Sequence, residues 1–485
     1  MKKRSLNGII LILAAAVSAC GGGGSDSGGS TLIVPPTNVT PTPTPPPTTC
    51  SLLNRQNFAA SVLNEWYLFP ETLPTALSPS AYTSVDDYID ALTATARSQG
   101  RDRFFTYVTS IQEENAYFSS GATAGFGVRL SYQGTRLFVI EAFEGAPALT
   151  AGIDRGTEIV GIGTNSSNII AVSDILAAQG SAGVSSALGP NTVGTSRVLR
   201  ITDSMGTRNV TVAKAEYDIT PLSSRYGVKV IDNGGGQRVG YINMRTFIST
   251  ADNQLRTAFS DFRTQGITNF VIDFRYNGGG LVSTAEVMGD LLGGNRSSSD
   301  IFSVTRFRAS KSVPPNDYTE TRRFAPQTQS VSPVKIAFIS TRATASASEL
   351  VAAAFAPFLG ANAALVGSNS YGKPVGQIGL DLAACDDRIR VVAFAKENAA
   401  GQGDYFSGLA GTMRTTCAAA DDITRPLGDP QEASLRAALD FVAGRSCTPI
   451  ALAQSAQSTA SANERRVLPA PTNASTAQRE VPGLF

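Results

Sequence analysis

The sequence VKIAFISTRATASASELVAAAFAPF, residues 334–358, joins a short apolar segment to an alanine-rich one. The pattern predicts a strand over 334–339 and a helix that begins at Ser346 and ends near Phe358. Apolar segments of strand length and helix length alternate in the same way over 239–445, which predicts an α/β domain. At the start of a helix, free N–H groups favour negative charge, so Ser346 suits either a nucleophile or an ordinary cap.

The chain has 485 residues and no histidine. This excludes every mechanism that depends on imidazole, including Ser-His-Asp and Cys-His catalysis and histidine-ligated zinc. A hydrolase on this chain therefore needs a lysine or a carboxylate as its base, and we predict no metal and no cofactor. The 40 basic and 39 acidic residues give a net charge of +1 without a basic block, which argues against a nucleic-acid partner.

Lys373 is the candidate base. It follows the next predicted strand, 364–367, so the chain can return to the sheet edge that holds Ser346. An exposed lysine has a pKa near ~10.4, and a lysine base needs that pKa lowered by about three units through burial. The uncharged residues on either side permit this burial. Gln377 is neutral and can hold the amine by a hydrogen bond without raising its pKa.

A nucleotide site is the rival interpretation of the same lysine. Residues 367–373 fit the first seven positions of a phosphate-binding P-loop, and 270–273 imitate its acidic strand. Pro374 at the eighth position supplies neither a hydroxyl for magnesium nor a backbone N–H, and it cannot continue a helix. We therefore predict no nucleotide partner.

Residues 118–217 contain short β-branched runs separated by glycines, which predict a small β-rich domain. Two of its passages resemble a PDZ domain: Gly125-Phe126-Gly127-Val128, and EGAPA…AGI…GTEI within 144–159. The resemblance implies that the first passage binds a terminal carboxylate through backbone N–H groups while the bound peptide adds a strand. Residues 50–117 have helical spacing and predict an N-terminal helical domain.

Three passages carry a more specific resemblance: DFRYNGGG at 273–280, TASASE at 344–349 and GKPVGQ at 372–377. With the PDZ-like passages, they resemble the carboxyl-terminal processing (tail-specific) protease family, whose members are serine peptidases with a Ser-Lys dyad. The resemblance implies a crotonase/Clp-protease-like α/β catalytic domain over 218–450. The predicted fold class is thus multidomain α+β and α/β, with a helical cap, a PDZ-like domain and this catalytic domain.

The same resemblance assigns roles to individual residues. Ser346 is implied to be the nucleophile, Lys373 the general base, and Gln377 the residue that positions the lysine. The glycine turn and the Ser346 N–H are implied to form the oxyanion hole. Gly280 is our first choice within that turn, and Gly279 is the second.

The beginning of the sequence predicts export. Residues 1–19 have the basic start and apolar run of a signal peptide, and their end resembles a lipobox before Cys20. We predict lipidation of Cys20, a Gly/Ser/Pro/Thr linker over 20–49, and membrane contact through the lipid alone. The glycine after Cys20 resembles the sorting context of lipoproteins in the outer membrane of the bacterial envelope, facing the periplasm. The polar composition of 451–485 predicts a disordered tail.

Four other cysteines are available for two disulfides in an oxidising compartment. They are Cys50, Cys385, Cys417 and Cys447. Three pairings exist, and we favour Cys385 with Cys417 and Cys50 with Cys447. Buried free thiols are the alternative.

The predicted function is a serine endopeptidase that cuts exported polypeptides near exposed carboxyl termini, with the PDZ-like domain recognising the tail. The alternative is a catalytically inactive lipoprotein that scaffolds periplasmic partners, because retinoid-binding relatives share this fold without being proteases. Retention of Ser346, Lys373 and Gln377 together favours the enzyme.

Overall fold

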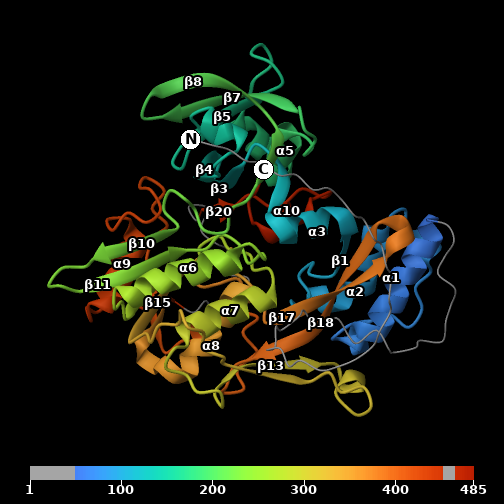
Figure 1. Cartoon of the computed structure of the whole chain (residues 1–485). Coiled ribbons are helices and arrows are strands. Elements are labelled where there is room, and N and C mark those ends of the chain that lie inside the picture. The colour runs from blue at the N-terminus through green and yellow to red at the C-terminus, as the bar shows by residue number, and fades with distance from the viewer. Residues whose placement is uncertain (1–49, 452–464) are drawn as a thin grey trace, which may run out of the picture.

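A computed structural model describes residues 50–451 and 465–485 of the chain. The predicted signal peptide, Cys20 and the linker lie outside the described residues. Figure 1 shows a β-rich body at the top, a body with helices and a sheet below it, and the helices α1 and α2 to one side. Within the described ranges, no helix combines the length and the apolar character that crossing a bilayer requires.

The central element of the lower body is a six-stranded sheet in the order β10-β11-β12-β15-β16-β19, parallel from β11 onward. Its strands are β10 (Val228–Asp232), β11 (Arg238–Asn243), β12 (Asn269–Asp273), β15 (Lys335–Ser340), β16 (Ala363–Gly367) and β19 (Thr415–Ala418). Such parallel strands are apolar on both faces because helices cover both. The predicted strand at 334–339 and the helix from Ser346 correspond to β15 and α8 (Ala347–Leu359).

Alternate residues of each strand pack against different helices. Phe270 and Ile272 of β12 face the cluster formed with α6 (Ala251–Thr264), α7 (Val282–Leu292) and α8. Val271, between them, faces α9 (Ala433–Val442) in a second cluster. The period of two along a strand thus builds two cores from one sheet.

A five-stranded antiparallel sheet joins the beginning of the described chain to the lower body. Its strands are β1 (Tyr107–Ser110), β13 (Ile301–Phe307), β14 (Glu320–Arg323), β17 (Val375–Leu382) and β18 (Asp387–Glu397). The helices α1 (Leu52–Trp66) and α2 (Val85–Ser98) pack on β17 and β18 through one apolar cluster. The Leu68 N–H also donates to the Val392 oxygen at 2.9 Å. The segment 50–117 therefore contains a strand as well as helices, and it shares its core with the region of Lys373.

The upper body is built on a sheet of order β20-β3-β4-β5-β7-β8, in which β6 pairs with β5 and the neighbouring strands run antiparallel. Its strands are β3 (Val128–Gln133), β4 (Arg136–Ala142), β5 (Glu158–Gly163), β6 (Ile170–Ala171), β7 (Ser196–Asp203), β8 (Gly206–Ala213) and β20 (Arg466–Val467). The helix α5 (Val172–Leu188) contributes to its apolar core. A separate pair of strands, β2 (Ala122–Gly125) and β9 (Ala215–Asp218), connects this body to α3 (Ile111–Ser120).

The prediction of a disordered tail over 451–485 is wrong for 465–485. This segment forms β20 and α10 (Thr476–Glu480), and its apolar side chains are buried. Buried are Leu468, Ala477, Val481, Leu484 and Phe485. The polar composition shows only that the segment has too few apolar residues to form a core of its own. It is ordered because distant parts of the chain supply the surfaces that bury those residues.

The favoured disulfide pairing is also wrong. Cys50 pairs with Cys385, and Cys417 pairs with Cys447, each with a Cα–Cα distance of 5.3 Å. Because α1 packs on β18, Cys50, two residues before α1, reaches the turn between β17 and β18 that contains Cys385. Cys447 follows α9 and lies beside β19, where the Ala418 N–H donates to the Thr448 oxygen at 2.7 Å.

Replacing Cys417 and Cys447 together by alanine is expected to lower the stability of the fold by about 3 kcal/mol, because the disulfide constrains the unfolded chain across 30 residues. Thermal unfolding of the variant beside the native chain measures the loss. Peptide mapping without reduction is the independent check. Cross-linked peptides that join Cys385 to Cys417 would contradict the pairing.

Candidate active site

Three loops meet at the carboxyl edge of the parallel sheet, because β12, β15 and β16 are neighbours in it. The glycine turn follows β12, the loop to Ser346 follows β15, and the loop to Lys373 follows β16. Backbone hydrogen bonds join them: the Ala345 N–H donates to the Asn277 oxygen at 3.0 Å, and the Tyr371 N–H to the Thr344 oxygen at 2.8 Å. The fold thus gathers all three passages that the sequence singled out.

Ser346 does not have the backbone of an ordinary helix cap. Its φ is 55° and its ψ is −115°, whereas the cap of α2, Ser84, has φ −139° and ψ 165° in the usual extended region. A positive φ in a residue other than glycine costs on the order of 1–3 kcal/mol and persists only where its surroundings impose it. The serine thus sits in a strained turn at the start of α8.

Glu349 imposes that turn. Its carboxylate is fully buried, and Oε2 accepts hydrogen bonds from the N–H groups of Ser346 at 2.9 Å and Lys373 at 2.7 Å. Oε1 accepts a third, from Gly372 at 2.7 Å. Burial raises the pKa of Glu349 from its usual value, against these hydrogen bonds, which lower it. One oxygen therefore fixes the backbones of the predicted nucleophile and the predicted base relative to each other.

Lys373 is held by neutral groups. Its Nζ donates to Gln377 Oε1 at 2.8 Å, and Gln377 Nε2 donates to the Phe105 oxygen at 2.5 Å. The amine also lies 4.8 Å from the centre of the Phe105 ring. Burial lowers the pKa of Lys373, against the carboxylates of Glu480 and Asp102, which raise it. The balance favours the neutral amine more than water does.

The backbones of the two predicted dyad residues share the Glu349 carboxylate, but no hydrogen bond of the described residues joins their side chains. Within the described residues, Lys373 Nζ donates to Gln377 and no hydrogen bond links it to Ser346 Oγ. The Ser346 N–H, expected in the oxyanion hole, is held by Glu349 instead. The three loops of the predicted site therefore meet, but in this conformation the Ser346 N–H and the Lys373 amine both bind other partners.

The glycine turn fits closely around the serine. Gly279 has φ 117°, and a side chain added there would begin 2.7 Å from the Ser346 Cβ. Gly280 has φ 129°, and a side chain there would meet the Phe247 oxygen at 2.2 Å. The Gly279 N–H already donates to Asn277 Oδ1 at 2.9 Å, whereas no hydrogen bond of the described residues uses the Gly280 N–H. Gly280 is therefore the available donor of the two.

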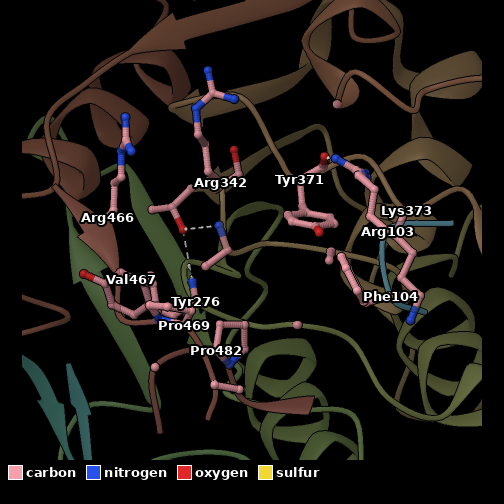
Figure 2. A pocket seen from close by; sticks show the side chains of 18 of the residues that line it. Arg103, Phe104, Tyr276, Arg342, Tyr371, Lys373, Arg466, Val467, Pro469 and Pro482 are labelled. Atoms are coloured by element: carbon pink, nitrogen blue, oxygen red, sulfur yellow. Dashed lines mark hydrogen bonds between the residues drawn. The ribbon is translucent and has the colours of Figure 1, made fainter. Parts of the chain in front are cut away.

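A cleft of about 1830 Å³ opens on this edge of the sheet. Its walls include Gly278, Ala345 and Lys373 from the three loops, and Glu480 and Pro482 from the C-terminal segment. Figure 2 shows Lys373, Tyr371 and Arg103 on one side of the cleft and Pro482 with Pro469 on another. The Arg103 guanidinium donates to the main-chain oxygens of Tyr371 and Gly372. This joins the segment 50–117 to the loop that contains Lys373.

The loop Gly125-Phe126-Gly127-Val128 lies at the start of β3 and contacts the last residue of the sequence. The Phe485 main-chain oxygen accepts hydrogen bonds from the Gly127 N–H at 2.9 Å and the Val128 N–H at 3.3 Å. The Phe485 N–H donates back to the Val128 oxygen at 2.9 Å. The chain's own end thus runs along β3 as an added strand.

The comparison with protein families bears on the lower body. Residues 238–406 match the family model described as peptidase family S41. This part of the chain is similar to peptidase family S41. The matched segment begins at β11 and includes the glycine turn, Ser346, Lys373 and Gln377.

Two curated proteins extend this similarity beyond the matched segment. A chloroplastic C-terminal processing peptidase of Tetradesmus obliquus is 25% identical over 280 residues, which are 54% of this chain and 54% of that protein. A carboxyl-terminal-processing protease of Picosynechococcus is 26% identical over 258 residues, which are 53% of this chain and 55% of that protein. The matches thus span about half the length of these relatives.

A solved structure shows the fold. The crystal structure named "Putative S41 protease" from Bacteroides fragilis superposes with a TM-score of 0.62 at 20% identity, over 80% of this chain and 97% of that one.

Glu349 lies within the TASASE passage, but the sequence predicted no role for it. The available signal was its position three residues after a serine at a helix start, which is the spacing of a capping box. The contact of Phe105 with Gln377 had no signal, because the two residues are far apart in the sequence.

We expect Glu349→Ala to lower stability by about 3 kcal/mol or more, because it leaves one buried and two partly buried N–H groups without an acceptor. Denaturant unfolding compared with the native chain measures the change. Glu216→Ala, at an exposed position of β9, is the matched control and should change stability by less than about 0.5 kcal/mol. Equal effects of the two substitutions would contradict the role given to Glu349.

Proposed function

We propose that this chain is a serine endopeptidase that cuts polypeptides near exposed carboxyl termini, with Ser346 as nucleophile and Lys373 as general base. The observation that carries the proposal is the Glu349 carboxylate, which fixes the backbones of both residues through one oxygen. A serine that only caps a helix does not require a carboxylate that also binds the loop of Lys373. A lysine that only serves as a surface charge does not require Gln377 and the Phe105 ring beside its amine.

The first chemical step is attack of Ser346 Oγ on a peptide carbonyl, while neutral Lys373 takes the hydroxyl proton. The Gly280 N–H stabilises the oxyanion that forms, and the positive end of α8 adds to that stabilisation. The protonated lysine then gives its proton to the leaving amine. The same lysine, now neutral, takes a proton from water as the water attacks the ester. It returns that proton to Ser346 Oγ when the ester bond breaks, which restores the serine hydroxyl and the neutral amine.

Assembly of this site requires a change from the conformation described. The lysine has to move its hydrogen bond from Gln377 toward Ser346 Oγ. Gln377 remains the residue that keeps the amine at the site, since its own amide is anchored on the Phe105 oxygen. No metal or cofactor enters any step.

The body around β3 is proposed to act as a PDZ domain that receives a substrate's carboxyl terminus. Support comes from the strand that the chain's own end adds to β3, and from the N–H groups of Gly127 and Val128 that converge on the last main-chain oxygen. The helices α1 and α2 with their loop to β1 are proposed to form the cap over the lysine side of the cleft.

The enzyme is proposed to be an exported lipoprotein of the bacterial envelope, anchored through Cys20 and facing the periplasm. The sequence of residues 1–20 carries this part of the proposal. The two disulfides agree with an oxidising compartment.

Substitution of the dyad tests the enzyme proposal. Ser346→Ala and Lys373→Ala should each lower cleavage of an unstructured protein with an apolar C-terminus by at least about 10³-fold. Mass spectrometry of the products gives the rates and the cut sites. Ser332→Ala, at an exposed serine, should cut at the native rate. Cleavage by either dyad variant at the native rate would contradict the mechanism, and an intact substrate with every variant would favour the scaffold alternative.

The state of the lysine predicts a pH dependence. Because Lys373 works as the neutral amine, kcat/KM should rise with pH and level off above the lysine pKa, which burial lowers. Gln377→Glu should move the rising limb to higher pH by about one unit, because a carboxylate stabilises the charged lysine. Gln265→Glu, at the exposed end of α6, is the matched control. A limb that stays in place in Gln377→Glu would contradict the role of Lys373.

A further inference from the structure

The C-terminal segment, residues 465–485, covers the open edge of β3 along most of its length. β20 pairs with Ser131 and Tyr132, and the Leu468 N–H donates to the Leu130 oxygen at 2.9 Å. After α10 the chain returns to the same edge, where the Leu130 N–H donates to the Gly483 oxygen at 2.8 Å. Figure 1 shows the C-terminus beside this sheet. The groove that a substrate tail would enter is therefore filled by the protein itself.

The end of the segment is bound as a ligand with a preferred last residue. Leu484 and Phe485 are each 2% exposed, and Phe485 packs into the apolar core of the β3 body together with Phe126. The main-chain oxygen of Phe485 accepts hydrogen bonds from the Gly127 and Val128 N–H groups. A groove with this shape selects an extended peptide that ends in a large apolar or aromatic residue.

The same segment crosses the predicted active site. The main-chain oxygen of Glu480 lies so close to Gly278 that the Cβ of a side chain added to that glycine would be 2.4 Å from it. The Arg129 guanidinium donates to the oxygens of Tyr276, at 2.5 Å, and Pro482, at 3.2 Å, so it holds the glycine turn and the segment together. Glu480 also faces the cleft of Lys373, where its charge favours the protonated lysine.

Contacts with the helical segment complete the attachment. The Thr476 hydroxyl lies 2.9 Å from that of Thr109, and the Thr476 N–H donates to the Glu113 carboxylate. Arg479 pairs with Asp86 at 3.8 Å. Residues 465–485 thus contact the β3 sheet, the glycine turn near Ser346 and the segment 50–117. Release of residues 465–485 would remove all of these contacts.

We propose that residues 465–485 are an intramolecular inhibitor, a ligand for the β3 groove that also lies across the active site and must leave before a substrate tail can bind. The proposal rests on the proposed function, since it names what occupies that function's groove and site. A tethered ligand has an effective concentration in the millimolar range, so only substrates with a well-fitting apolar end compete with it.

Peptide binding tests the occupancy without any catalysis. In a Ser346→Ala background, a fluorescent decapeptide TAQREVPGLF, the sequence of 476–485, should bind weakly to the full chain. Leu484→Asp with Phe485→Asp should release the segment, because two charges cannot stay in the apolar groove, and should tighten binding of the decapeptide at least 50-fold. Thr472→Asp with Asn473→Asp adds the same charge at exposed positions of the segment and should leave binding weak. Equal affinity for the full chain and the released variant would overturn the proposal.

A measurement on the unaltered chain covers the case in which the released variant does not fold. Hydrogen exchange should show protection of the Leu484 and Phe485 amides, since the Leu484 N–H donates to the Val481 oxygen and the Phe485 N–H donates to the Val128 oxygen of β3. Exchange of these amides at the rate of an unfolded chain would equally overturn the proposal.

Cleavage assays with active Ser346 separate this inference from the proposed function. The released variant should cut a reporter with an apolar C-terminus at least tenfold faster than the full chain, and the free decapeptide should slow it again. Equal rates for the full chain and the released variant would overturn the inhibitory role. If no variant cuts while the decapeptide still distinguishes the two chains, the proposed enzyme function fails and the occupied groove stands.

Discussion

The buried carboxylate of Glu349 is the constraint on which the site depends. It closes the turn at the start of α8 and ties the lysine loop to it, and its three N–H donors come from two loops that follow different strands. A buried carboxylate is costly unless such donors satisfy it. The same bonds that make the charge tolerable therefore hold Ser346 in a conformation that serine avoids on its own.

In the proposed mechanism, this arrangement separates the positioning of Ser346 and Lys373 from their activation. The backbones of Ser346 and Lys373 are fixed, whereas the lysine amine is free to exchange one neutral hydrogen-bond partner for another. In the proposed mechanism, the lysine has to make this exchange before the site can react. The C-terminal segment lines the cleft in which the exchange would occur, so the proposed inhibitor would also limit access to it.

The sequence predicted those features whose causes are local. Strand–helix alternation over 239–445 reflects the parallel sheet, and the passages at 273–280, 344–349 and 372–377 mark the loops that follow its strands. The role of Glu349 was within reach, because its spacing from Ser346 is a local signal. The disulfide pairing was not, since it depends on α1 packing against β18 and on α9 packing against the sheet.

The C-terminal segment was mispredicted for a related reason. Its polar composition cannot build a core, but five of its apolar side chains enter cores that other parts of the chain provide. The most direct measurement is mass spectrometry of the enzyme quenched with acid during turnover of an activated ester with an apolar acyl group. The account predicts an acyl adduct on the peptide that contains Ser346, lost in Lys373→Ala; an adduct on another residue, or one that does not depend on Lys373, would contradict it.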